Sequence, residues 1–195
     1  MLINKNINPI ILIIITLNIL FYMYNAYVNG SSVLTGINPM QRLNAGGMSQ
    51  GYSLWRIFTS LFVHASLLHL AANMIVLYLL SLMIGSYLSY FKLALIYLFS
   101  GLIGNVIGLL LTPNTVMCGA STAIFGMLGT LIVKAIIERH NNPKQLILVA
   151  ILSVYLMTIT YIDDSTNNTL HFSGLVSGFI IVFILKIKVK ISHET

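Results

Sequence analysis

The chain has 195 residues, of which 57% are hydrophobic and only 7% are charged. Soluble domains typically carry about 25% charged residues, so this chain lacks the polar surface that a water-soluble globule needs. Its net charge is +6, but the basic residues lie at the ends of apolar runs and do not alternate with aromatic residues, which excludes a nucleic-acid-binding surface. The composition indicates an all-α, polytopic membrane protein surrounded by the lipid bilayer.

We expect a single domain over residues 1–195, because no polar linker or shift in composition divides the sequence. The single cysteine, Cys118, excludes an internal disulfide and a metal site built from several cysteines. The first apolar run is too long for the core of a signal peptide, and no small-residue cleavage site follows it. We therefore expect this run to stay in the mature protein.

Six apolar runs predict six membrane-spanning helices. A bilayer core about 30 Å thick needs roughly 20 apolar residues per helix. The runs are continuous rather than alternating, and an open sheet edge cannot lie in lipid, so strands are not expected. The predicted spans are Pro9–Val28, Ser66–Gly85, Phe91–Leu111, Ser121–Ile137, Gln145–Tyr161 and Leu170–Val189.

The lysines and arginines predict the orientation. With the N-terminus inside, eight of them fall on the cytoplasmic side and two, Arg42 and Arg56, fall outside. Cytoplasmic loops carry an excess of basic residues, so both termini are predicted to be cytoplasmic, with the lysines at the inner ends of spans snorkelling to the headgroups. The cytoplasmic set is Lys5, Lys92, Lys134, Arg139, Lys144, Lys186, Lys188 and Lys190.

The connection between the first two spans, residues 29–56, is the long one. A loop of this length in a compact domain is usually functional or has structure of its own. Aromatic and apolar side chains occur in it among glycines, which predicts a position in the membrane interface. These side chains are Leu43, Met48, Tyr52 and Trp55.

Polar side chains at membrane depth are the strongest functional signal. His69, Asn73, Ser121 and His171 lie at or just inside the predicted outer ends of spans, and His64 lies slightly further out. The second, fourth and sixth spans all run from outside to inside, so these groups share one depth. A lone serine or asparagine is more typical of helix–helix contact. The shared depth on three helices is what predicts a site.

The residue types indicate acyl-transfer chemistry. Ser121 and His171 are a candidate nucleophile and general base. His69 and Asn73 are one helical turn apart and face the same way, and together with the Ser121 N–H at a helix start they suit a developing oxyanion. Phe125, one turn after Ser121, is placed to orient the imidazole by packing.

A Ser–His dyad is favoured over a triad. Asp163 and Asp164 precede the last span, but the sequence DDSTNN is typical of a solvated turn. Glu138 falls at the opposite membrane face. Glycines predict close contact between the fourth and sixth spans, which the dyad requires. These glycines are Gly126, Gly129, Gly174 and Gly178.

Four motifs, in this order along the chain, resemble those of the rhomboid family of intramembrane serine proteases. The resemblance runs from about Trp55 to Gly178. Each motif is weak alone, and the four together are specific. They are WR at Trp55–Arg56, HASLLHLAAN with His64, His69 and Asn73, GASTAIFG with Gly119 and Ser121, and HFSG with His171, followed by Gly178.

The resemblance implies a six-helix rhomboid-type bundle that cleaves transmembrane segments of other membrane proteins near their outer ends, without a metal or cofactor. It implies that Ser121 is the nucleophile, His171 its base, and the oxyanion hole His69, Asn73 and the Ser121 amide. Thr122 and Leu170 stand where the family often has a glycine and a small residue. A compact form of this kind suits a bacterial plasma membrane. Supporting positions are His64, Gly119, Phe125, Gly174 and Gly178.

Three alternatives are open. A catalytically inactive rhomboid-like protein would act as a membrane binder or escort, although such proteins usually lack the serine or the histidine. A small transporter or channel would need polar groups through to the inner half, where the second, fourth and sixth spans are nearly all apolar apart from snorkelling lysines. Cys118 is a further candidate nucleophile, but no base is placed beside it, and a small buried residue is the plainer interpretation.

Overall fold

The computed structural model describes residues 9–85, 88–162 and 167–185. Within these ranges the secondary structure is helical, with one isolated β-bridge between Met48 and Met117, so the all-α prediction is confirmed there. In chain order, the helices are α1 (Pro9–Asn29), α2 (Ser32–Thr35), α3 (Pro39–Asn44), α4 (Arg56–Thr59), α5 (Leu67–Gly85), α6 (Tyr90–Leu111), α7 (Ser121–Ile137), α8 (Pro143–Ile162) and α9 (Asn168–Ile184).

Four of these helices, α1, α5, α6 and α8, are long and apolar enough to cross a membrane. Helices α7 and α9 have 17 residues each and are apolar but shorter. The count of six spans therefore stays a prediction. Parts of the sequence interpretation lie outside the described residues, namely the end of the last predicted span after residue 185, and Lys5, Asp163, Asp164, Lys186, Lys188 and Lys190.

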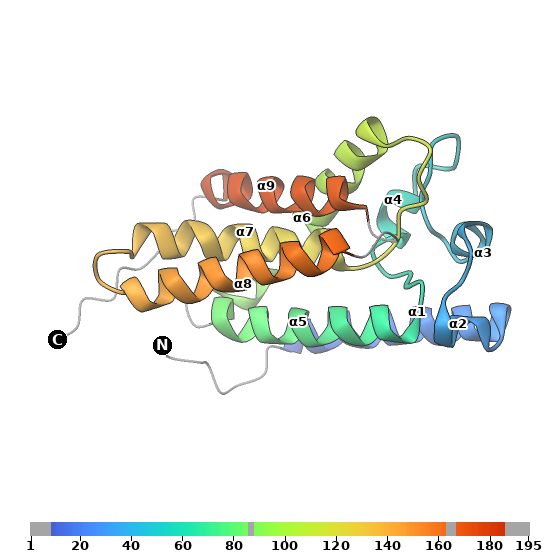
Figure 1. Cartoon of the computed structure of the whole chain (residues 1–195), viewed down its shortest axis with the longest axis horizontal. Helices are drawn as coiled ribbons and strands as arrows, with labels where there is room; N and C mark the ends of the chain where they lie inside the picture. Colours follow the sequence, from blue (N-terminus) through green and yellow to red (C-terminus); the bar gives the residue numbers. More distant parts are fainter. Residues whose placement is uncertain (1–8, 86–87, 163–166, 186–195) are drawn as a thin grey trace.

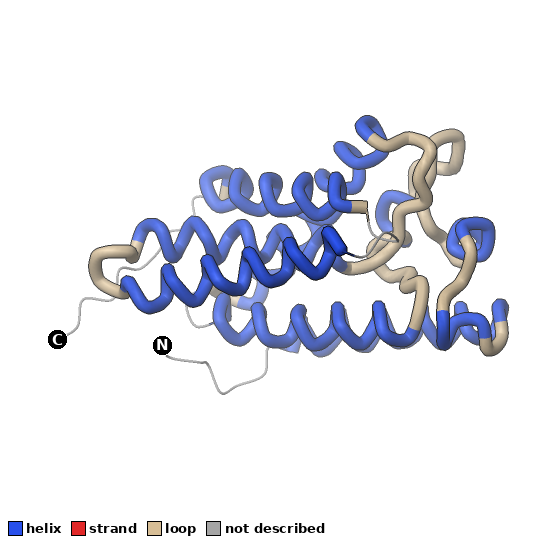
Figure 2. The backbone as a smooth tube through the Cα atoms, viewed as in Figure 1, coloured by secondary structure: helices blue, strands red, loops and turns tan. Residues whose placement is uncertain are grey.

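Helix α7 is the central helix of an elongated bundle (Figure 1). It contacts α5, α6, α8 and α9, and most of its side chains are buried. The starts of α5, α7 and α9 and the end of α8 lie at one end of the bundle, where α2, α3 and α4 also lie (Figure 1). Figure 2 shows the long connections gathered at this end. The chain thereby brings several helix termini together at one place.

Glycines allow α7 and α9 to touch along their backbones. A Cβ atom on Gly178 would overlap the carbonyl of Gly126, and one on Gly174 would overlap the carbonyl of Thr122. Small residues at such positions let helices pack at short range, where van der Waals contact is strongest. This packing sets the separation between side chains on the two helices.

The long connection has structure of its own. Helix α3 begins with a capping box, in which the side chains and N–H groups of Asn38 and Gln41 bond reciprocally. Further on, Met48 exchanges backbone hydrogen bonds of 2.9 and 2.7 Å with Met117, just before α7. Residues 30–59 are therefore tied directly to the approach to α7. They are called the outer segment below, because the sequence predicts that they lie on the outer side of the membrane.

Lys134 departs from the prediction of snorkelling lysines. Its side chain is buried, and its Nζ lies 2.5 Å from Glu138 Oε2 and 3.3 Å from Gln145 Oε1. Glu138 is one helical turn further along and Gln145 is near the start of α8, so the ammonium finds its partners inside the protein. The snorkelling prediction is wrong for this residue.

Candidate active site

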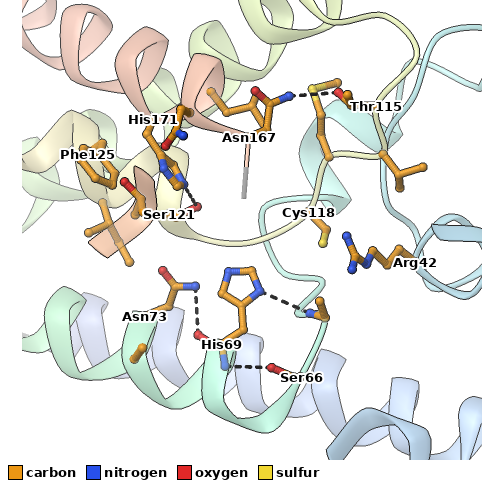
Figure 3. Close-up of a pocket in the computed structure, with 18 of the residues that line it drawn as sticks. Arg42, Ser66, His69, Asn73, Thr115, Cys118, Ser121, Phe125, Asn167 and His171 are labelled. Atoms are coloured by element: carbon orange, nitrogen blue, oxygen red, sulfur yellow. Dashed lines mark hydrogen bonds between the residues drawn. The ribbon is translucent and has the colours of Figure 1, made fainter. Parts of the chain in front are cut away.

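A cavity of about 760 Å³ opens among the gathered helix ends. Its wall includes Leu68 and Ala72 of α5, and Leu156 and Ile159 of α8, which places apolar side chains along one part of the wall. Five of the residues predicted to form or support the Ser–His site also line it (Figure 3): His69, Asn73, Ser121, Phe125 and His171.

Ser121 and His171 meet across the α7–α9 contact. Ser121 is the first residue of α7 and His171 lies in the first turn of α9. The Ser121 Oγ is 2.8 Å from the His171 Nε2, the distance of a good hydrogen bond. The close backbone contacts at Gly174 and Gly178 make this hydrogen bond possible, because the serine hydroxyl can meet the imidazole only where the two helices nearly touch.

Phe125 lies against the imidazole. Its ring and that of His171 stack with centroids 4.6 Å apart and an angle of 14° between their planes. Phe125 is buried and sits one turn after Ser121 on α7. The stack fixes the plane of the His171 ring, so that its Nε2 faces the hydroxyl.

The loop before Ser121 requires a glycine at position 119. Gly119 has φ +116, in the region that favours glycine. A Cβ atom there would lie 2.8 Å from His69 Cε1 and 2.9 Å from His69 Nε2, so this edge of the imidazole lies against the loop. The Ala65 N–H donates to His69 Nδ1 at 3.4 Å. A neutral His69 ring therefore carries its proton on Nε2, the nitrogen that faces Gly119.

Two more donor groups lie beside the dyad. The N-cap residue of α7 is Ala120, which supplies no side-chain cap, so the N–H of Ser121 keeps the donor capacity of a helix start. Asn73 is buried in the cavity wall, and its Nδ2 donates to the His69 carbonyl at 3.0 Å. This bond holds the amide in place, and the amide has a second N–H.

His64 is a buried, neutral bridge behind the site. Its Nδ1 lies 3.2 Å from the Phe62 carbonyl, and the Ala120 N–H donates to its Nε2 at 3.5 Å. Burial lowers the pKa of His64 to about 3, with a further lowering from His69 and an opposing effect of the Phe62 carbonyl. A neutral ring suits this geometry, because Nδ1 donates while Nε2 accepts.

Sequence reasoning missed a second support of the loop. The Gly119 N–H donates to the Ser60 carbonyl at 2.8 Å, and Asn105 of α6 donates to Ser60 Oγ and to the Ile57 carbonyl, each at 3.0 Å. Asn105 is a polar residue inside an apolar run, the same signal that identified Asn73. It was overlooked because only the outer ends of the second, fourth and sixth spans were compared.

Cys118 also lines the cavity, next to Gly119. Burial raises the pKa of its thiol to about 11, against a smaller lowering by the Arg42 cation. The thiolate is the nucleophilic form, so a thiol held protonated near neutral pH is poorly suited to attack. Ser121, whose Oγ lies 2.8 Å from His171 Nε2, is the better candidate nucleophile.

Comparison with known proteins identifies the family. Residues 51–188 match the family model described as "Rhomboid domain". The chain belongs to the rhomboid family. Its apolar helices and this membership make it an integral, multi-pass membrane protein.

Relatives with assigned names agree with this membership. The chain is 26% identical to "Putative rhomboid protease YdcA" of Bacillus subtilis (strain 168) over 90% of this chain and 88% of that protein. It is 27% identical to "RHOMBOID-like protein 1" of Arabidopsis thaliana and to "Rhomboid-like protease 3" of Toxoplasma gondii, over 82% and 66% of this chain. It spans only 41% and 49% of the lengths of those two relatives.

Proposed function

We propose that this protein is an intramembrane serine endopeptidase that cleaves transmembrane segments of other membrane proteins near their outer ends. The observation that carries the proposal is the 2.8 Å contact between Ser121 Oγ and His171 Nε2 within a cavity among apolar helices. Two of the relatives have names that include the word protease, which supports the same activity.

The chemistry follows the dyad. The Ser121 Oγ attacks the scissile carbonyl carbon while His171 Nε2 takes the hydroxyl proton. The negative charge that develops on the carbonyl oxygen faces the Ser121 N–H, the His69 Nε2–H and the Asn73 amide. His171 then gives its proton to the leaving amine, and an acyl group stays on Ser121. A water molecule, deprotonated by His171, releases the acyl group and restores the serine.

The proposed placement in the membrane has six spans in one domain, residues 1–195, with both termini cytoplasmic, in a bacterial plasma membrane. At 1.5 Å per residue, the 17 residues of α7 extend about 25 Å, less than a bilayer core of about 30 Å. If α7 reaches the inner face, Ser121 lies below the outer surface. The substrate then reaches Ser121 from the membrane between α5 and α8, whose side chains line the cavity.

The decisive experiment is cleavage of a single-span reporter by purified protein in detergent, with mass spectrometry of the products. We expect the wild type to cut one bond, and Ser121→Ala and His171→Ala to lower the rate by more than about 1000-fold. His140→Ala, at an exposed position, is the control and should cut normally. If neither the wild type nor the two variants cleave any of several reporters, the binding or escort alternative is favoured.

A further inference from the structure

Arg42 brings a positive charge to the cavity that holds the dyad. It lies in α3, within the outer segment, and its side chain lines the cavity wall together with Cys118. Figure 3 shows the guanidinium directed toward Cys118, three residues before Ser121. In the sequence interpretation, Arg42 served only as evidence for topology. The structure places it beside the route that a substrate would follow.

The backbone of Arg42 is fixed relative to the nucleophile. Its carbonyl accepts from the Gly47 N–H at 2.8 Å, and Met48, the next residue, pairs with Met117. A Cβ atom on Gly47 would lie 2.7 Å from the Arg42 carbonyl oxygen, so this turn is tightly packed. The connection from Arg42 to the loop before Ser121 therefore runs through short backbone contacts.

Only part of the Arg42 guanidinium is hydrogen-bonded to described residues. The Nε of Arg42 donates to the Ile37 carbonyl at 3.0 Å, and within the described residues its terminal amino groups have no hydrogen bond or ion pair. The other arginine of this segment, Arg56, has more partners within the fold. It contacts two carbonyl oxygens and two aromatic rings of the outer segment, those of Leu43, Gly47, Tyr52 and Trp55.

Among the described residues of the cavity wall, no acidic side chain balances the charge of Arg42. The sequence has four acidic residues, of which Glu138 is paired with Lys134 far along α7. The other three, Asp163, Asp164 and Glu194, lie outside the described residues. None of the described residues that line the cavity is acidic. A partly desolvated guanidinium binds a carboxylate more strongly than an exposed one does, through paired N–H donors.

On the basis of the proposed function, we propose that Arg42 is a specificity-determining residue that binds the carboxylate of an aspartate or glutamate in the substrate. Because α3 belongs to the outer segment, this acidic residue lies on the side of the scissile bond that faces away from the membrane. Substrates would then be membrane proteins with an acidic residue just outside the span that is cut.

The test uses pairs of single-span reporters that carry Asp or Asn at one position, scanned over about six residues on the outer side of the cut. At the matching position we expect the wild type to cleave the Asp reporter with a kcat/KM about 10-fold above that of the Asn reporter, the size of one charged hydrogen bond. Arg42→Gln should bring this ratio close to one, and Arg42→Glu should favour a Lys reporter. Arg139→Gln, exposed at the other end of α7, is the matched control.

The outcomes separate this proposal from the proposed function. If the wild type cuts Asp and Asn reporters equally while Ser121→Ala cuts neither, the peptidase stands and the role of Arg42 is overturned. If no reporter is cut, a binding measurement tests the role of Arg42. It uses the Ser121→Ala protein and two labelled reporter segments, one with Asp and one with Asn at the same position. A dissociation constant about 10-fold lower for the Asp segment, lost in the Ser121→Ala/Arg42→Gln protein, supports the proposal, and equal constants overturn it.

Two other anions give distinct results. If Arg42 instead binds an anionic lipid, Arg42→Gln should lower the cleavage rates of both reporters equally. This effect should occur only in bicelles that contain phosphatidylglycerol. If Arg42 instead binds a carboxylate of the chain itself, the Asp163→Asn/Asp164→Asn protein should cleave the Asp reporter much faster than the wild type does. The Arg42→Gln protein should then keep the wild-type ratio of Asp to Asn cleavage. Either result overturns the assignment of Arg42 to substrate.

Discussion

Thr122 and Gly104 are matched in size across the contact between α6 and α7, since a Cβ atom on Gly104 would lie 2.5 Å from Thr122 Cγ2. A second match lies one turn further along α6, where a Cβ atom on Gly108 would overlap the Leu170 side chain. Thr122 and Leu170 are the two residues that the sequence analysis singled out as larger than the resemblance implies. Both larger side chains are accommodated by glycines of α6.

We predict that Gly104→Ala lowers the free energy of unfolding by about 1–3 kcal/mol, because overpacking against buried Thr122 and the Gly174 backbone outweighs the gain in helix propensity. Thr122→Ser removes the Cγ2 methyl and should restore part of this loss. Unfolding in mixed detergent micelles measures both. Gly85→Ala is the control, since no atom of the described residues lies within 4 Å of a Cβ atom there. Equal effects of the two alanines would contradict the size match.

We predict that Phe125→Leu lowers kcat by about 10- to 100-fold with little change in KM, because the His171 ring loses the surface that sets its plane. The measurement is steady-state cleavage of the reporter. Phe172→Leu is the matched control, because Phe172 is next to His171 but 60% exposed. A KM effect in Phe125→Leu with kcat unchanged would assign Phe125 to substrate binding.

Much of the arrangement follows from the lengths of the apolar runs and from the shared depth of the polar residues. The apolar runs lie close to the helices that the structure contains, and the shared depth of His69, Ser121 and His171 anticipated that they line one cavity. The Met48–Met117 pair could not be predicted, since it joins distant loop residues that carry no pairing pattern. The burial of Lys134 could not be predicted either, because its contact with Gln145 depends on how the turn between α7 and α8 brings the two helices together.

Stability should depend on pH through His64. Its folded pKa of about 3 is below the ordinary value of 6.5, so between these values the unfolded chain binds the extra proton. The free energy of unfolding should therefore fall as the pH is lowered from about 6.5 toward 3, and this histidine should add no slope above that range. Thermal unfolding of wild type and His64→Gln at several pH values measures the difference.

The His64→Gln protein should be less stable at pH 8, because its hydrogen bonds to Phe62 and Ala120 are weakened, and the gap to the wild type should narrow as the pH falls. His140→Gln, at an exposed position, should follow the wild type throughout. A gap between wild type and His64→Gln that stays constant from pH 8 to pH 4 would show that His64 is not held neutral.

The buried Lys134–Glu138 pair gives a further prediction. Glu138→Gln leaves the Lys134 ammonium without its carboxylate and should cost about 3–5 kcal/mol of stability. Lys134→Met/Glu138→Leu removes both charges and should recover most of this loss. Arg139→Gln, one residue further and exposed, should change stability by less than about 0.5 kcal/mol. A loss in the double variant as large as in Glu138→Gln would show that the pair itself is stabilising.

The most direct test of the account is covalent labelling by a fluorophosphonate, which reacts with an activated serine without any knowledge of the substrate. We expect the wild-type protein to be labelled at Ser121, as located by peptide mass spectrometry, and His171→Ala and Ser121→Ala to remain unlabelled. Cys118→Ala should be labelled like the wild type. An unlabelled wild type, or labelling of Ser121 that persists at the same rate in His171→Ala, would contradict the dyad.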